Sequence, residues 1–140
     1  MTESQHFRKL EQAYLNARCN EYYQPQIKIS RGEAEIVIAV QEKYFHAAHA
    51  VHGSVYFKML DDAAYFAVNS LVRDVFVLTV SFHLHLLRPI SRGTMRAIGK
   101  AYFSSRALYA GESILYDDKG REIARGSGLF AKSKLEIGKG

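Results

Sequence analysis

An acidic residue in the middle of an apolar segment is the residue of this sequence best placed to do chemistry. Asp61 lies in the stretch VYFKMLDDAAYFAVNSL, residues 55–71, which has no glycine or proline. Aspartate is a poor helix former, and burying an unpaired carboxylate costs several kcal/mol. The neighbouring Asp62 follows Lys58 by four residues, the spacing of an ordinary ion pair on a helix. Asp61 is therefore the candidate general base or nucleophile, with a pKa moved by partial desolvation; a carboxylate satisfied by a neighbouring chain is the alternative.

A second candidate is the Gly53-Ser54 pair, which stands just before this segment. Glycine lets a ligand approach the backbone closely, serine is a frequent N-cap residue, and the first amides of a helix stabilise negative charge. The pair predicts an oxyanion site, although an ordinary glycine at a helix start explains it equally simply. Eight residues of helix put Gly53 and Asp61 ~12 Å apart. The two can therefore act on one carbonyl only if two helices meet across a dimer interface.

The histidines form a third group, because five of the six lie between residues 46 and 85. His83 and His85 alternate along a predicted strand, and imidazoles at that spacing can bind one metal ion. No acidic residue accompanies them on the strand, so we expect hydrogen bonds within a packed interface and no resident metal; a metal-binding barrel is the alternative. The chain has no GxSxG, GxxxxGK[ST], GxGxxG or CxxC motif.

The order of the predicted elements is typical of an α+β domain. The pattern predicts helices at about 3–19 and 55–71, a loop at 46–53, and strands at about 33–41, 75–88, 94–103, 107–116 and 121–132. The long helix is apolar on almost every side and must be buried. The four consecutive strands after it predict an antiparallel meander that curves around the helix, in a single domain with its core at about 27–133.

Alternation along residues 75–88 divides that strand between two faces. It places Leu78 and Val80 on the face toward the helix and Thr79 on the opposite face. Tyr102, Tyr109 and Tyr116, or their neighbours along the strands, are expected on the outer face of the sheet. A second subunit would then cover that apolar surface.

Composition narrows the class of protein further. The 140 residues suffice for one domain, and 48% hydrophobic residues exclude a mainly disordered chain. The single cysteine, Cys19, excludes an internal disulfide, and the polar start MTESQHFRKL is unlike a signal peptide. No apolar run reaches the ~18 residues of a membrane span, so we expect a cytoplasmic protein without a membrane partner. The net charge of +5 is scattered, which makes nucleic acid a weak candidate and fits a phosphate-bearing small molecule as well.

Several separated motifs resemble those of the hotdog-fold acyl-CoA thioesterases of the phenylacetic-acid-degradation (PaaI-like) type. The segment HGSVYFKMLDDAAYFAVNS, residues 52–70, is similar to that family's His-Gly-Gly turn and its Leu-x-Asp-x-Ala helix. Thr79, the LLRP run at 86–89 and the DDKGREIA hairpin at 117–124 follow in the family's order. The resemblance covers roughly residues 33–133 and implies a hotdog fold, in which a curved antiparallel sheet wraps round one long central helix.

The resemblance also implies how the chain hydrolyses a thioester. The Gly53 amide polarises the carbonyl, and Asp61 of the opposite subunit serves as base or nucleophile. Thr79 holds the attacking water or steadies the aspartate. His52 and Ser54 are expected to bind substrate beside the turn.

The chain departs from the family at two positions. His46 stands where the family usually has an asparagine that assists at the carbonyl, and Ser54 replaces the second glycine of His-Gly-Gly. A neutral imidazole can still donate a hydrogen bond to a carbonyl oxygen, and it could also act as a second base.

The resemblance implies no separate cofactor, because CoA is part of the acyl-CoA substrate, and it implies a homodimer or a dimer of dimers. Four basic residues near strand ends could meet the CoA phosphates, although surface solvation explains each of them: Arg88, Arg92, Arg106 and Lys132. The alternative function is a non-catalytic hotdog protein that binds acyl-CoA or an acyl carrier.

Overall fold

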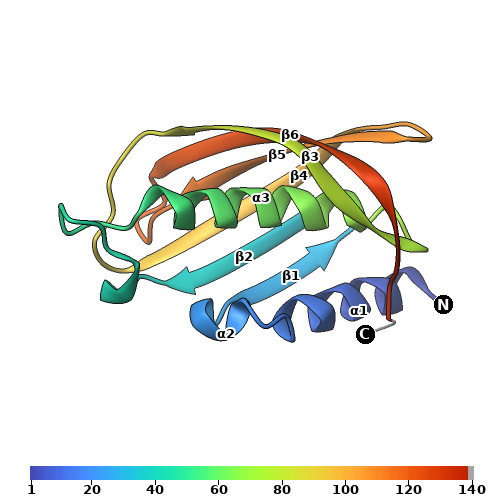
Figure 1. Cartoon of the computed structure of the whole chain (residues 1–140), viewed down its shortest axis with the longest axis horizontal. Coiled ribbons are helices and arrows are strands. Elements are labelled where there is room, and N and C mark those ends of the chain that lie inside the picture. The colour runs from blue at the N-terminus through green and yellow to red at the C-terminus, as the bar shows by residue number, and fades with distance from the viewer. Residues whose placement is uncertain (139–140) are drawn as a thin grey trace.

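The structure, a computed structural model that describes residues 1–138, consists of one curved sheet with a long helix across its concave face (Figure 1). Its helices are α1 (Glu3–Leu15), α2 (Asn20–Tyr23), a short 3₁₀ turn (Glu42–Tyr44) and α3 (Gly53–Asn69). Its strands are β1 (Gln26–Ser30), β2 (Glu33–Ala39), β3 (Val75–Leu86), β4 (Thr94–Ser104), β5 (Leu108–Tyr116) and β6 (Glu122–Glu136). No helix within residues 1–138 has the length and apolar character needed to cross a bilayer.

The strands pair antiparallel in the order β1-β2-β4-β5-β6-β3, which confirms the fold class and corrects the strand order. The expected meander placed β3 beside β4, but β3 lies at the far edge and pairs with β6. Because α3 crosses the sheet, the chain leaves the helix at that far edge, and β4 then returns to pair with β2. Strand β1 was not expected, since QIKIS is short and follows Pro25 directly.

Small residues let α3 lie directly on the sheet. Ala63 and Ala64 are fully buried on its inner side. A Cβ at Gly99 of β4 would lie 2.2 Å from the backbone of Ala63, so only glycine permits this approach. On β5, the Ser113 hydroxyl donates to the Leu60 carbonyl oxygen at 2.7 Å. These contacts fix the helix against the strands and thereby position Asp61.

A bulge in β3 reverses the faces expected for part of that strand. The pairing of β3 with β6 shifts between Thr79 and Ser81. Before the shift, Val77 is fully buried against α3, while Leu78 is 51% exposed; after it, Phe82 packs inward. An extra residue in one strand moves every following side chain to the other face. The expectation that Thr79 points away from the helix is therefore wrong.

Apolar side chains remain exposed on the outer face of the sheet and along the free edge of β3. Tyr102 is exposed as expected, but Tyr109 is buried against α3, which corrects its expected place on the outer face. Val80 and Leu86 are 61% and 51% exposed on the edge strand. Long apolar edge strands are surfaces that proteins usually cover.

The N-terminal segment is two helices instead of one helix to residue 19. α1 ends at Leu15, and the buried Asn20 side chain donates to the Tyr14 carbonyl oxygen at 2.8 Å. The same carbonyl oxygen also accepts from the Ala17 backbone N–H at 3.2 Å, so the Asn20 side chain adds a second bond where the helix ends. α1 runs beside β1 (Figure 1) and also reaches α3, where the Tyr14 and Phe66 rings meet edge to face at 5.0 Å.

Candidate active site

Asp61 projects from the middle of α3 toward β3, where a hydroxyl group binds it. Thr79 Oγ1 donates to Asp61 Oδ1 at 2.9 Å within the same chain. This contact depends on the bulge, which places Thr79 on the helix side of the strand. The structure therefore brings together two of the predicted site residues without a second subunit.

Burial raises the pKa of the Asp61 carboxyl from 3.8 to about 6. The Thr79 hydrogen bond lowers this pKa, the neighbouring Asp62 charge raises it, and the Lys58 ammonium lowers it again. A carboxyl with such a pKa is still ionised at neutral pH, yet it is a stronger base than an exposed aspartate. Its protonation state thus suits a general base near pH 7.

Asp62, the next residue, has a different environment. It forms an ion pair with Lys58, which confirms the pairing expected from their spacing. The Tyr14 hydroxyl donates to the same Asp62 oxygen at 2.7 Å. Burial of the Tyr14 phenol, together with the Asp62 charge, holds its pKa far above the usual value, so it stays a donor. Asp62 therefore ties α1 to α3.

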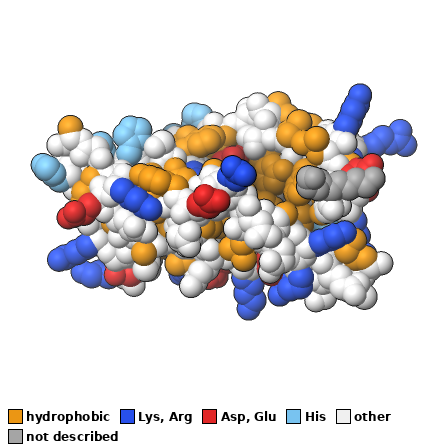
Figure 2. All heavy atoms as spheres, turned by 60° about the horizontal axis from the view of Figure 1, so that its bottom comes forward, with side chains coloured by type: hydrophobic (Ala, Val, Ile, Leu, Met, Phe, Trp, Pro, Cys, Tyr) orange, Lys and Arg blue, Asp and Glu red, His pale blue; other side chains and the backbone are white. Residues whose placement is uncertain are grey.

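A pocket of about 410 Å³ opens beside Asp61, between α3, β3 and the N-terminal helices. This volume lies in the range of small-molecule sites. Asp61 and Thr79 belong to its lining, and most of its remaining wall is apolar or aromatic: Ala13, Tyr14, Ala17, Tyr65, Phe66 and Phe76. Figure 2, which brings the α1 side of the molecule forward, shows apolar side chains gathered in a hollow on this face. Sequence reasoning missed the part taken by α1, because helical periodicity predicts a buried face and not what that face covers.

The start of α3 differs in detail from expectation, because His52 and not Ser54 is the N-cap residue. The His52 Nδ1 atom accepts from the Ser54 backbone N–H at 3.0 Å and lies 2.8 Å from Ser54 Oγ. Gly53 is the first helical residue, and its N–H has no acceptor within residues 1–138. A free amide at the positive end of a helix can stabilise an oxyanion.

His46 lies beside this helix start, in a second pocket of about 340 Å³ that Gly53 and Leu86 also line. Its Nδ1 atom accepts from the Ala48 N–H at 3.0 Å. In the neutral ring the other nitrogen, Nε2, then carries the proton and can donate. The structure thus brings His46 and Gly53 together and leaves a donor on each.

The four predicted catalytic residues fall into two separate pockets within one chain. Asp61 and Thr79 line the first, His46 and Gly53 line the second, and the two linings share no residue. The ~12 Å of α3 between Gly53 and Asp61 separates them. Within one chain, a single carbonyl group cannot contact both.

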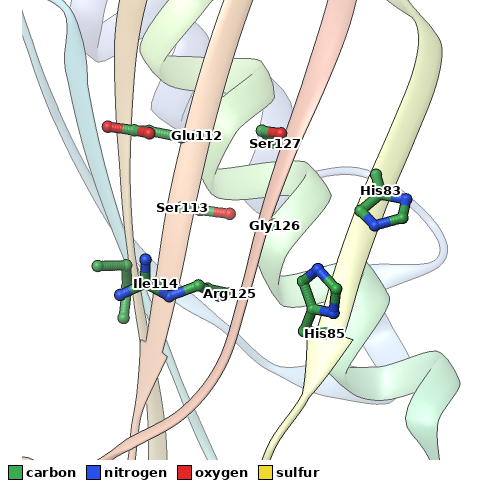
Figure 3. Close-up of a pocket in the computed structure, with 8 residues that line it drawn as sticks. All are labelled: His83, His85, Glu112, Ser113, Ile114, Arg125, Gly126 and Ser127. Carbon is green, nitrogen blue, oxygen red and sulfur yellow. The ribbon is translucent and has the colours of Figure 1, made fainter.

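His83 and His85 lie in another pocket, on the outer face of the sheet (Figure 3), with a ring-to-ring distance of 4.9 Å. Ser127 and Arg125 of β6 stand opposite them in the sheet. Within residues 1–138, no three His, Cys, Asp or Glu side chains are grouped as ligands for a metal ion. These histidines therefore line neither pocket of the candidate active site.

The basic residues considered for the CoA phosphates are dispersed. Arg88 lines the pocket of His46, and the Lys132 ammonium lies 3.8 Å from the Asp74 carboxylate. Arg92 and Arg106 are exposed beyond β3 and β4. The structure brings only Arg88 to the candidate active site.

The curved sheet around one long helix defines the class as a hotdog-fold protein, as the sequence predicted. Residues 48–124, more than half of the chain, match the family model described as the thioesterase superfamily. The chain belongs to the thioesterase superfamily. No curated protein sequence matches it.

Solved structures with low sequence identity share this fold. The PaaI protein from the phenylacetic acid degradation operon of Escherichia coli is 16% identical with a TM-score of 0.88, over 98% of this chain and 99% of that one. A thioesterase from Haemophilus influenzae is 12% identical with a TM-score of 0.81, over 95% and 92% of the two chains. A mutant of PaaI from Thermus thermophilus is 18% identical with a TM-score of 0.75, over 84% of this chain and 100% of that one. The fold is thus that of a PaaI-like hotdog protein.

Proposed function

We propose that this protein is an acyl-CoA thioesterase, which hydrolyses a thioester to a free acid and CoA. The observation that carries the proposal is the desolvated Asp61 carboxyl, which Thr79 holds beside an apolar pocket. Membership of the thioesterase superfamily supports a thioester substrate.

In the proposed reaction the two parts of the site act on one carbonyl group. The Asp61 carboxylate accepts a proton as a water oxygen bonds to the carbonyl carbon, or it attacks that carbon itself. The Gly53 amide and the His46 Nε2–H donate to the oxyanion that forms. Collapse of this intermediate breaks the C–S bond and expels the CoA thiolate. In the first route the thiolate takes up the proton held by Asp61; in the second, a mixed anhydride remains on Asp61, and a water molecule hydrolyses it, so that its hydroxyl group joins the acyl carbon and its proton goes to the thiolate. The products are the free acid and CoA.

A homodimer would supply both parts of each site. The free edge of β3 is long and apolar, and two such edges can pair antiparallel about a two-fold axis. Antiparallel pairing of the two β3 edges about their middle sets the Thr79 end of one strand beside the Leu86 end of its partner. Thr79 binds Asp61, and Leu86 touches the start of α3, since a Cβ on Gly53 would lie 2.9 Å from its Cδ1. Asp61 would then face the helix start of the other subunit. The exposed outer sheet face offers a second interface for a dimer of dimers.

A hydrolysis screen with a matched pair of variants tests the function. The purified protein is offered acetyl-, octanoyl-, palmitoyl- and phenylacetyl-CoA, and the released thiol is measured. Asp61→Asn keeps the shape of the side chain and removes the base, so kcat falls at least about a hundredfold. Asp62→Asn is the same change one residue away. It weakens the Lys58 pair and the Tyr14 hydrogen bond and removes a charge that raises the pKa of Asp61, but it leaves the base in place, so kcat falls by no more than about tenfold.

The other outcomes are informative. Hydrolysis that survives Asp61→Asn contradicts the role given to this carboxyl. Wild-type protein that binds acyl-CoA without releasing thiol supports a non-catalytic binding protein instead. Circular dichroism of both variants shows whether the fold is retained.

A further inference from the structure

We infer that the pocket beside Asp61 receives the acyl group of the substrate, and that the N-terminal helices form its outer wall and decide which acyl groups fit. The inference rests on the proposed function, because it names the substrate group that the site takes. The family match begins at residue 48, so α1 and α2 lie outside it. Their contribution to the pocket is therefore argued from this chain's own lining residues, Ala13, Tyr14 and Ala17.

The pocket is assigned to the acyl group because of where the thioester carbonyl must lie. Asp61 and Thr79 are part of its lining. A carbonyl carbon within reach of the Asp61 carboxylate therefore lies at the wall of this pocket. The pocket of His46 and Gly53 shares no residue with it, and the CoA arm would enter from that side of the partner subunit. The acyl group attached to that carbonyl carbon then enters the 410 Å³ pocket.

The lining favours a neutral, apolar acyl group. Phe66 contacts the Tyr14 ring edge to face at 5.0 Å and the Tyr65 ring at 4.9 Å, which forms a continuous aromatic wall. The Lys58 ammonium in the lining is already paired with Asp62 and the Tyr14 hydroxyl. An anionic acyl tail would find no free cation there and would face the Asp61 charge.

Small side chains of the N-terminal segment determine how much of the pocket volume is open to the acyl group. Ala13 lies on α1 and Ala17 in the turn after it, and both line the pocket. The hydrogen bond from Tyr14 to Asp62 holds α1 in place, so this wall cannot simply move away. A larger side chain at either alanine would therefore occupy the space of the acyl group.

Cys19 provides a direct binding test, because it is the only cysteine of the chain, is exposed, and lines the same pocket. Alkylation of the wild-type protein by N-ethylmaleimide is followed by intact mass, with saturating S-decyl-CoA or S-methyl-CoA. Both are thioethers that cannot be hydrolysed, and they differ only in the chain. S-decyl-CoA is expected to slow alkylation about tenfold and S-methyl-CoA at most about twofold. Equal rates with the two ligands overturn the inference.

A second test measures chain-length selectivity. Ala13→Phe is expected to lower the ratio of kcat/KM for decanoyl-CoA over acetyl-CoA at least about tenfold. Gln12→Phe is the matched control, since Gln12 is exposed on the same helix and outside the pocket, and it leaves the ratio unchanged. The ratio is taken on one preparation, so partial misfolding does not affect it. A uniform loss on both substrates contradicts the inference.

Failure of this inference and failure of the proposed function give different results. If S-decyl-CoA protects Cys19 but the wild-type protein hydrolyses no acyl-CoA, the acyl pocket stands and the thioesterase proposal fails. If decanoyl-CoA is hydrolysed while protection is absent and the Ala13→Phe ratio is unchanged, the thioesterase proposal stands and the acyl pocket is elsewhere.

Discussion

The start of α3 offers a hydrogen-bond donor and its middle offers a carboxylate base, and the two groups depend on opposite environments. At the start, the Gly53 N–H has no acceptor among residues 1–138 and lies in a pocket beside exposed polar side chains, and the helix dipole alone makes it a good donor. In the middle, the Asp61 carboxyl is useful only because burial raises its pKa. A donor for an oxyanion works without desolvation, whereas a carboxylate base at neutral pH needs it. A rigid helix keeps the two apart, so the reaction proposed above requires two helices that run in opposite directions.

The strongest test of this comparison disables the middle of α3 in one protomer and its start in the other. Asp61→Asn removes the base, and Gly53→Val places a side chain against Leu86 and the helix start. Each variant alone should lose at least about a hundredfold in kcat. Co-expression of the two should restore about a quarter of the wild-type activity, because half the dimers are mixed and each of these has one intact site.

The control is co-expression of Asp61→Asn with Asp61→Ala, which leaves no intact site in any dimer and should restore nothing. Activity that stays at the level of the single variants, in a preparation shown by mass spectrometry to contain mixed dimers, would mean that each site lies within one chain. The dimer arrangement proposed for β3 would then be wrong.

The pH dependence of hydrolysis tests the middle of the helix alone. Asp61 must be ionised to accept a proton, and its pKa is about 6, so kcat/KM should rise with pH and level off above a midpoint near 6. Thr79→Val removes the hydrogen bond that lowers this pKa. The midpoint should therefore move upward by up to about one unit, with a several-fold loss at pH 6.

A variant at the start of the helix is expected to change the pH profile differently from Thr79→Val. The Gly53 amide does not titrate, so a variant there should lower the whole profile without moving its midpoint. A midpoint near 4 in the wild-type protein, or a downward shift in Thr79→Val, would contradict the environment assigned to Asp61.

The parts of the site that could be predicted from the sequence are those that a local pattern determines. Asp61 stands out because a charged residue interrupts an apolar helix, and Gly53 because it directly precedes that helix. The contact of Thr79 with Asp61 could not be derived by alternation, since one bulge reverses the faces of the strand. The place of β3 at the sheet edge depends on pairing with β6, far along the chain. The wall that Ala13 adds to the pocket depends on how α1 docks through Tyr14 and Asp62, which is equally non-local.

The smallest expected effect concerns His52, for which the sequence implied substrate binding and the structure shows a cap. The Nδ1 atom of His52 accepts from the Ser54 N–H at the start of α3. Loss of an N-cap acceptor costs about 1 kcal/mol, so His52→Ala should lower the free energy of unfolding by that amount in urea titration. His52→Asn restores an acceptor at the cap and should recover most of it. If the cap is the whole role of His52, the asparagine variant also recovers hydrolysis. If hydrolysis stays low in a variant of restored stability, the imidazole itself binds substrate at the start of the helix.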